Sequence, residues 1–198
     1  MKRSVRTVDL GGAKAIILHR PHTVVAALTR QLLAVGLQVA VQWPTLEADA
    51  IAADFVFFDA DMGFDEQFPW DKPPMPMIAL IGSEAPGRVE WALSTGATAQ
   101  LLKPVGDSGV YSALLIARNA FEARRSLNAE VADLRQKLGE RQTVVRAVVM
   151  LMAQTGSEQA AYAALRQSAM DAQITLEAAA ARIIGRAQPQ EASSRDRK

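Results

Sequence analysis

The chain has 198 residues, of which 49% are apolar and 22% charged, and its formal net charge at pH 7 is +1. This size allows one α/β domain and one smaller unit. There is no cysteine, which excludes disulfides and thiolate zinc sites, and only His19 and His22 can supply imidazole ligands. No window approaches the ~20 apolar residues of a membrane span, so we expect a cytoplasmic protein.

Charge is distributed unevenly along the chain. Up to about Ala117 there are 9 Lys and Arg against 12 Asp and Glu, and after it 13 against 9. The first part is therefore −3 and the second +4. The difference is small, but it favours the C-terminal part as the one that meets an anion.

The first part predicts strands that alternate with helices. Short apolar runs predict strands at 15–18, 37–41, 55–58, 77–81 and 100–102, and helical spacing predicts helices at 24–33 and 88–93. This alternation predicts a doubly wound parallel five-stranded sheet, that is, an α/β fold. The segment 64–76 is rich in Pro and Asp and predicts an irregular loop in place of a helix.

A single long helix is predicted over 111–154, where proline is absent and Gly139 is the only glycine. Apolar residues follow a heptad pattern along it, with Arg141 as one polar member: Leu127, Val131, Leu134, Leu138, Val145, Val148 and Met152. The pattern favours a coiled-coil homodimer. A parallel arrangement of the two helices is favoured, and an antiparallel one stays open. A helix that packs on its own domain is the alternative.

Two shorter helices are predicted after the long one. Ser157 is placed to cap the first, with Glu158 in its first turn, and Thr175 is placed to cap the second, which we expect to end at Gly185. The predicted organisation is therefore an α/β domain over 1–117, a coiled-coil linker over 118–145, a helical domain over 146–186 and a disordered tail over 187–198.

The first domain resembles response-regulator receiver domains, which have a flavodoxin-like fold. The run 54–59 resembles the strand that ends in their phosphoacceptor aspartate, here Asp59, and the Lys103-Pro104 motif resembles the one whose lysine faces the acyl phosphate. Receivers hold Mg²⁺ with an acidic pair, but His19 and Arg20 occupy those positions here. The switch hydroxyl is replaced by Ile81.

These departures weigh against phosphorylation. Mg²⁺ prefers hard carboxylate oxygens, and phosphoryl transfer depends on the metal to neutralise charge. We therefore expect no metal and no cofactor, and a residual ion pair of Asp59 and Lys103 beside Arg20 at a vestigial phosphoacceptor site. The first domain is then a pseudo-receiver that acts through protein contact. No nucleophile-base pair or phosphate loop is visible, so we expect no enzymatic activity.

The C-terminal part resembles an ANTAR domain, the RNA-binding module of transcription antiterminators. The resemblance rests on Ala-x-x-x-Leu-Met at 147–152, on Glu158-x-x-Ala-Tyr162-x-x-Leu-Arg166, and on Leu176 with Ala180. It implies that four residues pack inside the domain: Ala147, Leu151, Met152 and Leu165. The position of a lysine usual in the family is Val148 here, which puts phosphate contact there in doubt.

RNA binding requires exposed cations for phosphate and an aromatic face for loop bases. The candidates are Arg146, Gln154, Tyr162 and Arg166. Tyr162 can equally be a core residue, and either arginine can be a solvated surface charge.

The whole chain resembles the AmiR/NasT family of antiterminators, to which the segment 42–44 also points. The resemblance implies a homodimer that binds leader-mRNA hairpins and is held silent by an amide-sensing protein partner. Two alternatives stay open: a phosphorylation-dependent response regulator, and a protein-interaction adaptor without RNA binding.

Overall fold

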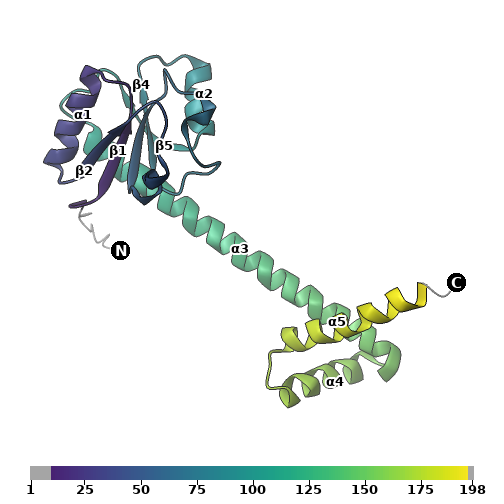
Figure 1. Cartoon of the computed structure of the whole chain (residues 1–198). Helices are drawn as coiled ribbons and strands as arrows, with labels where there is room; N and C mark the ends of the chain where they lie inside the picture. Colours follow the sequence, from purple (N-terminus) through teal and green to yellow (C-terminus); the bar gives the residue numbers. More distant parts are fainter. Residues whose placement is uncertain (1–9, 196–198) are drawn as a thin grey trace. The chain divides into compact units, whose positions relative to one another are not determined.

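The computed structural model describes residues 10–195, with side chains as far as 186, and divides into two compact units, Met1–Ser126 and Leu127–Lys198. Helix α3 (Val110–Thr155) contributes residues to both units. Figure 1 shows the elements of each unit along the chain. No helix in the described residues is long and apolar enough to cross a membrane.

The N-terminal unit is built on a five-stranded parallel sheet. Its strands are β1 (Lys14–Leu18), β2 (Gln38–Gln42), β3 (Phe55–Asp59), β4 (Met77–Ile81) and β5 (Ala97–Leu102). They lie in the order β2-β1-β3-β4-β5, which is the flavodoxin-like order of doubly wound proteins. The predicted fold class is thus confirmed, with each strand found within three residues of its predicted run.

The central strands β3 and β4 are buried along their whole length because both faces of the sheet are covered. Alternate residues enter two cores: Ile17 and Phe57 face one side with α1 and α3, and Leu18 and Phe58 face the other with α2. Figure 1 shows α1 and α2 on opposite sides of the sheet. Each strand therefore stabilises two layers.

Helix α1 (Thr23–Ala34) is capped by His22, whose Nδ1 accepts a hydrogen bond from the amide of Val24. The turn after it contains Gly36 with φ of 93°, a value that favours glycine. Helix α2 (Pro86–Ser94) has proline in its first turn, where the missing amide hydrogen is tolerated. The segment 64–76 is irregular as predicted and holds only the 3-10 turn η2 (Asp65–Gln67); a second such turn, η1 (Ala48–Ala52), lies between β2 and β3.

Helix α3 begins inside the first core, where Val110, Leu114 and Ala117 are buried against the sheet. Further along, its apolar heptad residues are exposed in the single chain: Leu127 is 59% exposed, Leu134 57%, Leu138 57% and Val145 61%, while Val131 is partly buried. The prediction that Val148 belongs to these exposed heptad residues is wrong. Val148 is 8% exposed and belongs to the core of the C-terminal unit, because α3 packs against two further helices there.

The C-terminal unit consists of the end of α3, α4 (Glu158–Asp171) and α5 (Leu176–Arg195). The predicted caps form: Ser157 Oγ accepts from the amide of Ala160, and Thr175 Oγ1 accepts from that of Ala178. The core is rich in alanine and holds Ala147, Val148, Ala161, Leu165, Ala169, Ala179 and Ala180.

The predicted end of the last helix at Gly185 is wrong, because α5 continues to Arg195. A glycine costs a helix only about 1 kcal/mol, which does not by itself end it. The tail that was expected to be disordered over 187–198 is thus helical as far as Arg195, and 196–198 lie outside the described residues.

We predict that Leu165→Ala lowers the free energy of unfolding of the C-terminal unit by about 2–5 kcal/mol, because a buried leucine leaves a cavity. Leu165 is 0% exposed. Urea unfolding of the full chain followed by circular dichroism measures the effect. The control Met170→Ala removes a side chain on the same helix that is 64% exposed, and should change the value by less than about 0.5 kcal/mol. Equal losses in the two variants would contradict the assigned core.

Candidate functional site

The first candidate site lies at the carboxyl edge of the sheet, where parallel strands bring their ends together. Asp59 is the last residue of β3, His19 follows β1, and Lys103 follows β5. Asp59 and His19 are each 2% exposed, and the Lys103 side chain is 15% exposed. Three ionisable groups from distant parts of the sequence are therefore held together away from solvent.

The Asp59 carboxylate has contacts on both oxygens. Its Oδ1 lies 2.6 Å from Lys103 Nζ and accepts a hydrogen bond of 3.1 Å from the amide of Asp61. Its Oδ2 lies 3.2 Å from Nε2 of His19. The carboxylate that would accept a phosphoryl group in a receiver is thus enclosed by neighbours of its own chain.

The expected ion pair of Asp59 and Lys103 forms, but the residue beside it is His19 and not Arg20. Arg20 is exposed, since β1 ends at Leu18 and consecutive residues there point in different directions. The Nδ1 of His19 lies 2.7 Å from the carbonyl oxygen of Arg20 and donates to it. The Nε2 atom of His19 is buried and has no hydrogen-bond partner within residues 10–195, so its 3.2 Å approach to Asp59 Oδ2 is a contact without a hydrogen bond.

The donor set at this edge does not suit Mg²⁺. The metal prefers several oxygen ligands in octahedral geometry, but the neighbours of Asp59 are an ammonium and an imidazole. Among the described residues, no group of three His, Asp or Glu side chains is placed to hold a metal ion. Ile81 is 1% exposed and offers no hydroxyl; its carbonyl oxygen accepts from the amide of Lys103 at 2.7 Å.

Asp61 is a member of this site that the sequence analysis missed. Its Oδ2 lies 2.6 Å from Lys103 Nζ and accepts a hydrogen bond of 2.7 Å from the amide of Gly82, while Oδ1 accepts one of 3.1 Å from Ser83. Burial alone would raise the pKa of the Asp61 carboxyl, but the hydrogen bonds from Lys103, Ser83 and Gly82 outweigh it and hold the pKa below its usual value. No motif marks Asp61; its position two residues after Asp59 was the only available signal.

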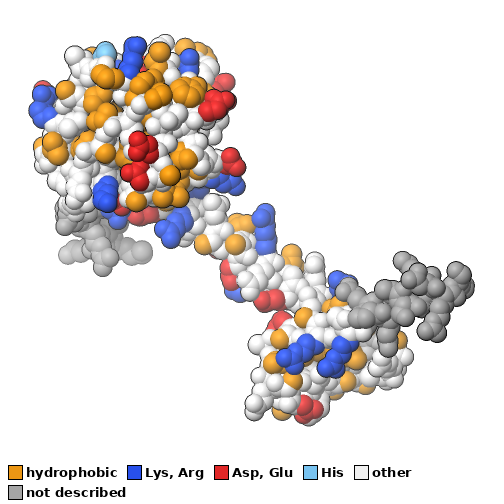
Figure 2. Space-filling view, viewed as in Figure 1, with side chains coloured by type: hydrophobic (Ala, Val, Ile, Leu, Met, Phe, Trp, Pro, Cys, Tyr) orange, Lys and Arg blue, Asp and Glu red, His pale blue; other side chains and the backbone are white. Residues whose placement is uncertain are grey.

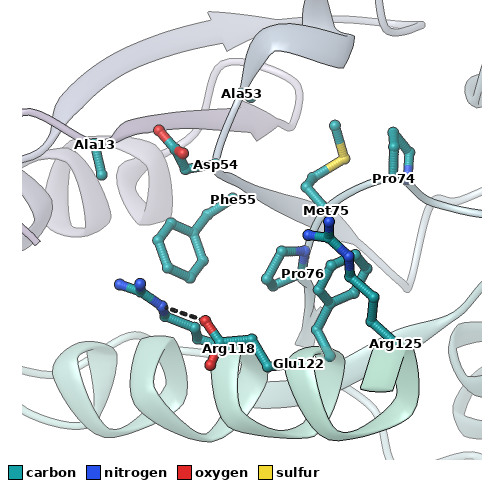
Figure 3. A pocket seen from close by; sticks show the side chains of 11 residues that line it. Ala13, Ala53, Asp54, Phe55, Pro74, Met75, Pro76, Arg118, Glu122 and Arg125 are labelled. Atoms are coloured by element: carbon teal, nitrogen blue, oxygen red, sulfur yellow. Dashed lines mark hydrogen bonds and ion pairs between the residues drawn. The ribbon is translucent and has the colours of Figure 1, made fainter. Parts of the chain in front are cut away.

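A pocket of about 250 Å³ opens at the opposite, amino edge of the sheet, beside the starts of β3 and β4 (Figure 3). Figure 3 shows Arg118, Glu122 and Arg125 of α3 along one side of it and Asp54 and Phe55 on another. Arg118 Nε donates to Glu122 Oε1 at 2.8 Å. None of the predicted site residues lines this pocket, so it lies apart from the Asp59 site.

The second candidate site is the outer surface of the C-terminal unit. All four residues predicted for RNA contact are exposed: Arg146, Gln154, Tyr162 and Arg166. Tyr162 is 46% exposed, so it is not a core residue. Tyr162 and Arg166 are four residues apart on α4 and therefore share one face of that helix.

The four predicted packing residues behave differently. Ala147 and Leu165 are 0% exposed, and Leu151 packs against the same core. Met152 is 38% exposed and lies outside the core, which corrects its expected packing role. Consecutive helical residues are separated by about 100°, so Leu151 and Met152 do not both point inward.

Two further exposed cations, Arg182 and Arg186, lie four residues apart on α5 and were missed from the sequence. Figure 2 shows Lys and Arg side chains grouped on the visible face of this unit. The net positive charge counted after Ala117 does not belong to the C-terminal unit alone. Three of the arginines in that count, Arg118, Arg124 and Arg125, belong to the N-terminal unit.

Residues 13–118 match the AmiR N-terminal family, and residues 132–184 match the ANTAR domain family. The chain is also similar to the transcriptional regulatory protein PdtaR of Mycobacterium tuberculosis, with 31% identity over 110 residues, 55% of this chain and 54% of that protein. The match thus spans about half the length of that curated relative.

Among solved structures, the chain is similar to full-length FixJ of B. japonicum, with 18% identity, coverage of 90% of this chain and 98% of that one, and a TM-score of 0.45. The chemotaxis response regulator CheY4 of Vibrio cholerae has 19% identity, covers 52% of this chain and 97% of its own, and has a TM-score of 0.42. The match to the AmiR N-terminal family extends over more than half of the chain, and the ANTAR match follows it in the same order as the two units. The chain therefore belongs to the AmiR/NasT-type family of ANTAR transcription regulators.

Proposed function

We propose that this protein is an antitermination regulator that binds stem-loops of a leader mRNA as a homodimer. In this proposal a ligand-sensing protein partner of the amide-sensor type, rather than phosphorylation, controls it. The observation that carries the proposal is the exposed pair of Tyr162 and Arg166 on one face of an ANTAR unit. The protein works in the cytoplasm, where nascent transcripts are made, and catalyses no reaction.

RNA hairpin loops are the proposed target because their bases are unstacked and accessible. Double-stranded RNA hides its base edges in a deep, narrow groove. An exposed tyrosine offers a stacking surface for one base, and the neighbouring arginine offers charge for a phosphate. Arg146, Arg182 and Gln154 supply further exposed polar contacts around the same small unit.

Val148 no longer counts against RNA binding by itself. It stands where a lysine is usual in the family, but its side chain is 8% exposed and packs in the core, so the site of phosphate contact must be sought on neighbouring residues. Arg146 is exposed two positions earlier and is the nearest cation on α3.

Dimerisation is proposed from the exposed apolar residues of α3. Leu127, Leu134 and Leu138 are each more than half exposed in the single chain, at heptad spacing. Pairing two such helices removes this surface from water. A dimer also carries two RNA-binding ends, so that binding of one hairpin raises the effective concentration of the second.

Control by a protein partner is proposed because the phosphoacceptor position is already satisfied. Asp59 is buried between Lys103 and His19, and its neighbours do not suit the metal that phosphoryl transfer requires. The principal rival remains a phosphorylation-dependent response regulator. A protein-interaction adaptor without RNA binding is the other, and the modest charge of the C-terminal unit keeps it open.

RNA binding is tested by a gel shift with the leader transcript of the protein's own operon. We expect Arg166→Ala to weaken binding about tenfold, which corresponds to the loss of roughly 1.4 kcal/mol. Tyr162→Ala should weaken it by one to three kcal/mol if the ring stacks on a base, that is, about fivefold or more. Lys72→Ala removes one exposed positive charge from the N-terminal unit and should leave the affinity unchanged. Absence of any wild-type complex with the leader would favour the adaptor.

The dimer is tested by sedimentation of a Leu134→Asp variant. A carboxylate in an apolar seam is costly to desolvate, so we expect a shift from dimer to monomer. Leu33→Asp is the matched control, since Leu33 of α1 and Leu134 are both 57% exposed. A wild-type monomer, or a Leu134→Asp dimer as stable as the wild type, would argue against the coiled coil.

Phosphorylation is tested with acetyl phosphate and Mg²⁺ followed by intact-mass measurement. We expect no added phosphoryl group on the wild type, because Lys103 and His19 surround the carboxylate and no group of three His, Asp or Glu side chains in the described part of the chain is placed to hold a metal ion. Asp59→Asn provides the background value. A stoichiometric, Mg²⁺-dependent mass increase that disappears in Asp59→Asn would support the phosphorylation rival instead.

A further inference from the structure

Three hydrogen-bond donors converge on one point at the carboxyl edge of the sheet. They are the amides of Gly82 and Ser83, which follow β4, and the ammonium of Lys103, which follows β5. All three meet the carboxylate of Asp61, with heavy-atom distances of 2.7, 3.1 and 2.6 Å. The same carboxylate group therefore receives two main-chain hydrogen bonds and one ion pair.

These donors are of the kinds that bind phosphate and sulfate in proteins. Successive main-chain amides form concavities that bind anions, and a lysine ammonium adds a full positive charge. Lys103 is also the residue whose counterpart in receivers faces the acyl phosphate. The structure thus contains an oxyanion site in which the anion is supplied by the chain itself.

Gly82 makes room for that anion. A Cβ atom at this position would lie 2.6 Å from Asp61 Oδ2 and 3.2 Å from Lys103 Cε, so a side chain there would force the carboxylate away. The φ of Gly82 is not in the left-handed region, so its backbone conformation alone does not require glycine. Because Gly82 has no side chain, the Asp61 carboxylate can approach its amide closely.

The loop that carries Asp61 is tied to the phosphoacceptor position as well. The amide of Asp61 donates to Asp59 Oδ1, and Lys103 contacts both carboxylates at 2.6 Å. An anion attached to Asp59 would need the donors that Asp61 already uses. Asp61 thus competes directly with a phosphoryl group for Lys103.

We propose that Asp61 is a built-in anion that fills an oxyanion site formed by Gly82, Ser83 and Lys103. Without the Asp61 carboxylate the site binds a free tetrahedral oxyanion of the phosphate or sulfate type. The proposal goes beyond the proposed function and does not depend on RNA binding. The Asp61 side chain is 23% exposed, so solvent ions reach the site once the carboxylate is removed.

The test is a titration of the full-length Asp61→Ala variant with inorganic phosphate, followed by NMR of chains labelled with ¹⁵N in glycine and serine. We expect saturable shifts of the Gly82 and Ser83 amide signals in this variant and none in the wild type. Glu66→Ala is the matched control: it removes an exposed carboxylate from the same β3–β4 connection and should behave as the wild type. Absence of saturable shifts in Asp61→Ala, or equal shifts in Glu66→Ala, would overturn the proposal.

A second measurement uses the wild type, so it does not depend on whether the Asp61→Ala variant folds. Couplings across the hydrogen bonds from the amide nitrogens of Gly82 and Ser83 to the Asp61 carboxyl carbon should be detectable, and Gly82→Ala should abolish them. Their absence in the wild type would show that Asp61 does not fill the site. Neither measurement contains RNA, so its failure leaves the proposed function untouched, and a failed gel shift leaves this site untouched.

Discussion

The ammonium of Lys103 contacts two carboxylates at once, and the carboxyl edge of the sheet depends on these contacts. Asp59 is almost fully buried, and an isolated buried charge is costly unless it is paired and hydrogen-bonded. Lys103 supplies the charge to Asp59 and Asp61 at 2.6 Å each, and main-chain amides supply most of the remaining bonds. The ends of β3 and β5 are thereby joined through Lys103, and the Asp61 carboxylate joins them to the end of β4.

Under the proposed function, this arrangement accounts for a receiver fold that is not controlled by phosphorylation. In a phosphorylatable site the lysine and the loop amides are available to an incoming group, whereas here they already have partners within the chain. His19 adds a further buried neighbour at the second oxygen of Asp59. The domain keeps its sheet and its packing against the start of α3.

The elements that could be predicted are those specified locally. The buried runs of β1, β3 and β4 and the caps at Ser157 and Thr175 carry their signal within a few residues, and they form as predicted. The role of Asp61 could not be predicted, because it depends on Gly82 and Lys103, which are far away in the sequence. His19 lies beside Asp59 where Arg20 was expected, because the direction of each side chain at the end of a strand decides which residue faces the site. Val148 was assigned to the wrong surface because a heptad pattern does not show where a helix gains a neighbour.

The alanine-rich core of the C-terminal unit has a consequence for how this unit responds to its ligand. Alanine buries little apolar surface, and a unit of this size retains only a small margin against unfolding. Any molecule that binds only the folded form stabilises it by mass action, in proportion to the logarithm of its concentration relative to Kd. If the unit binds RNA as proposed, the transcript would stabilise the folded helices of this unit, and their order would rise and fall with the concentration of nascent RNA.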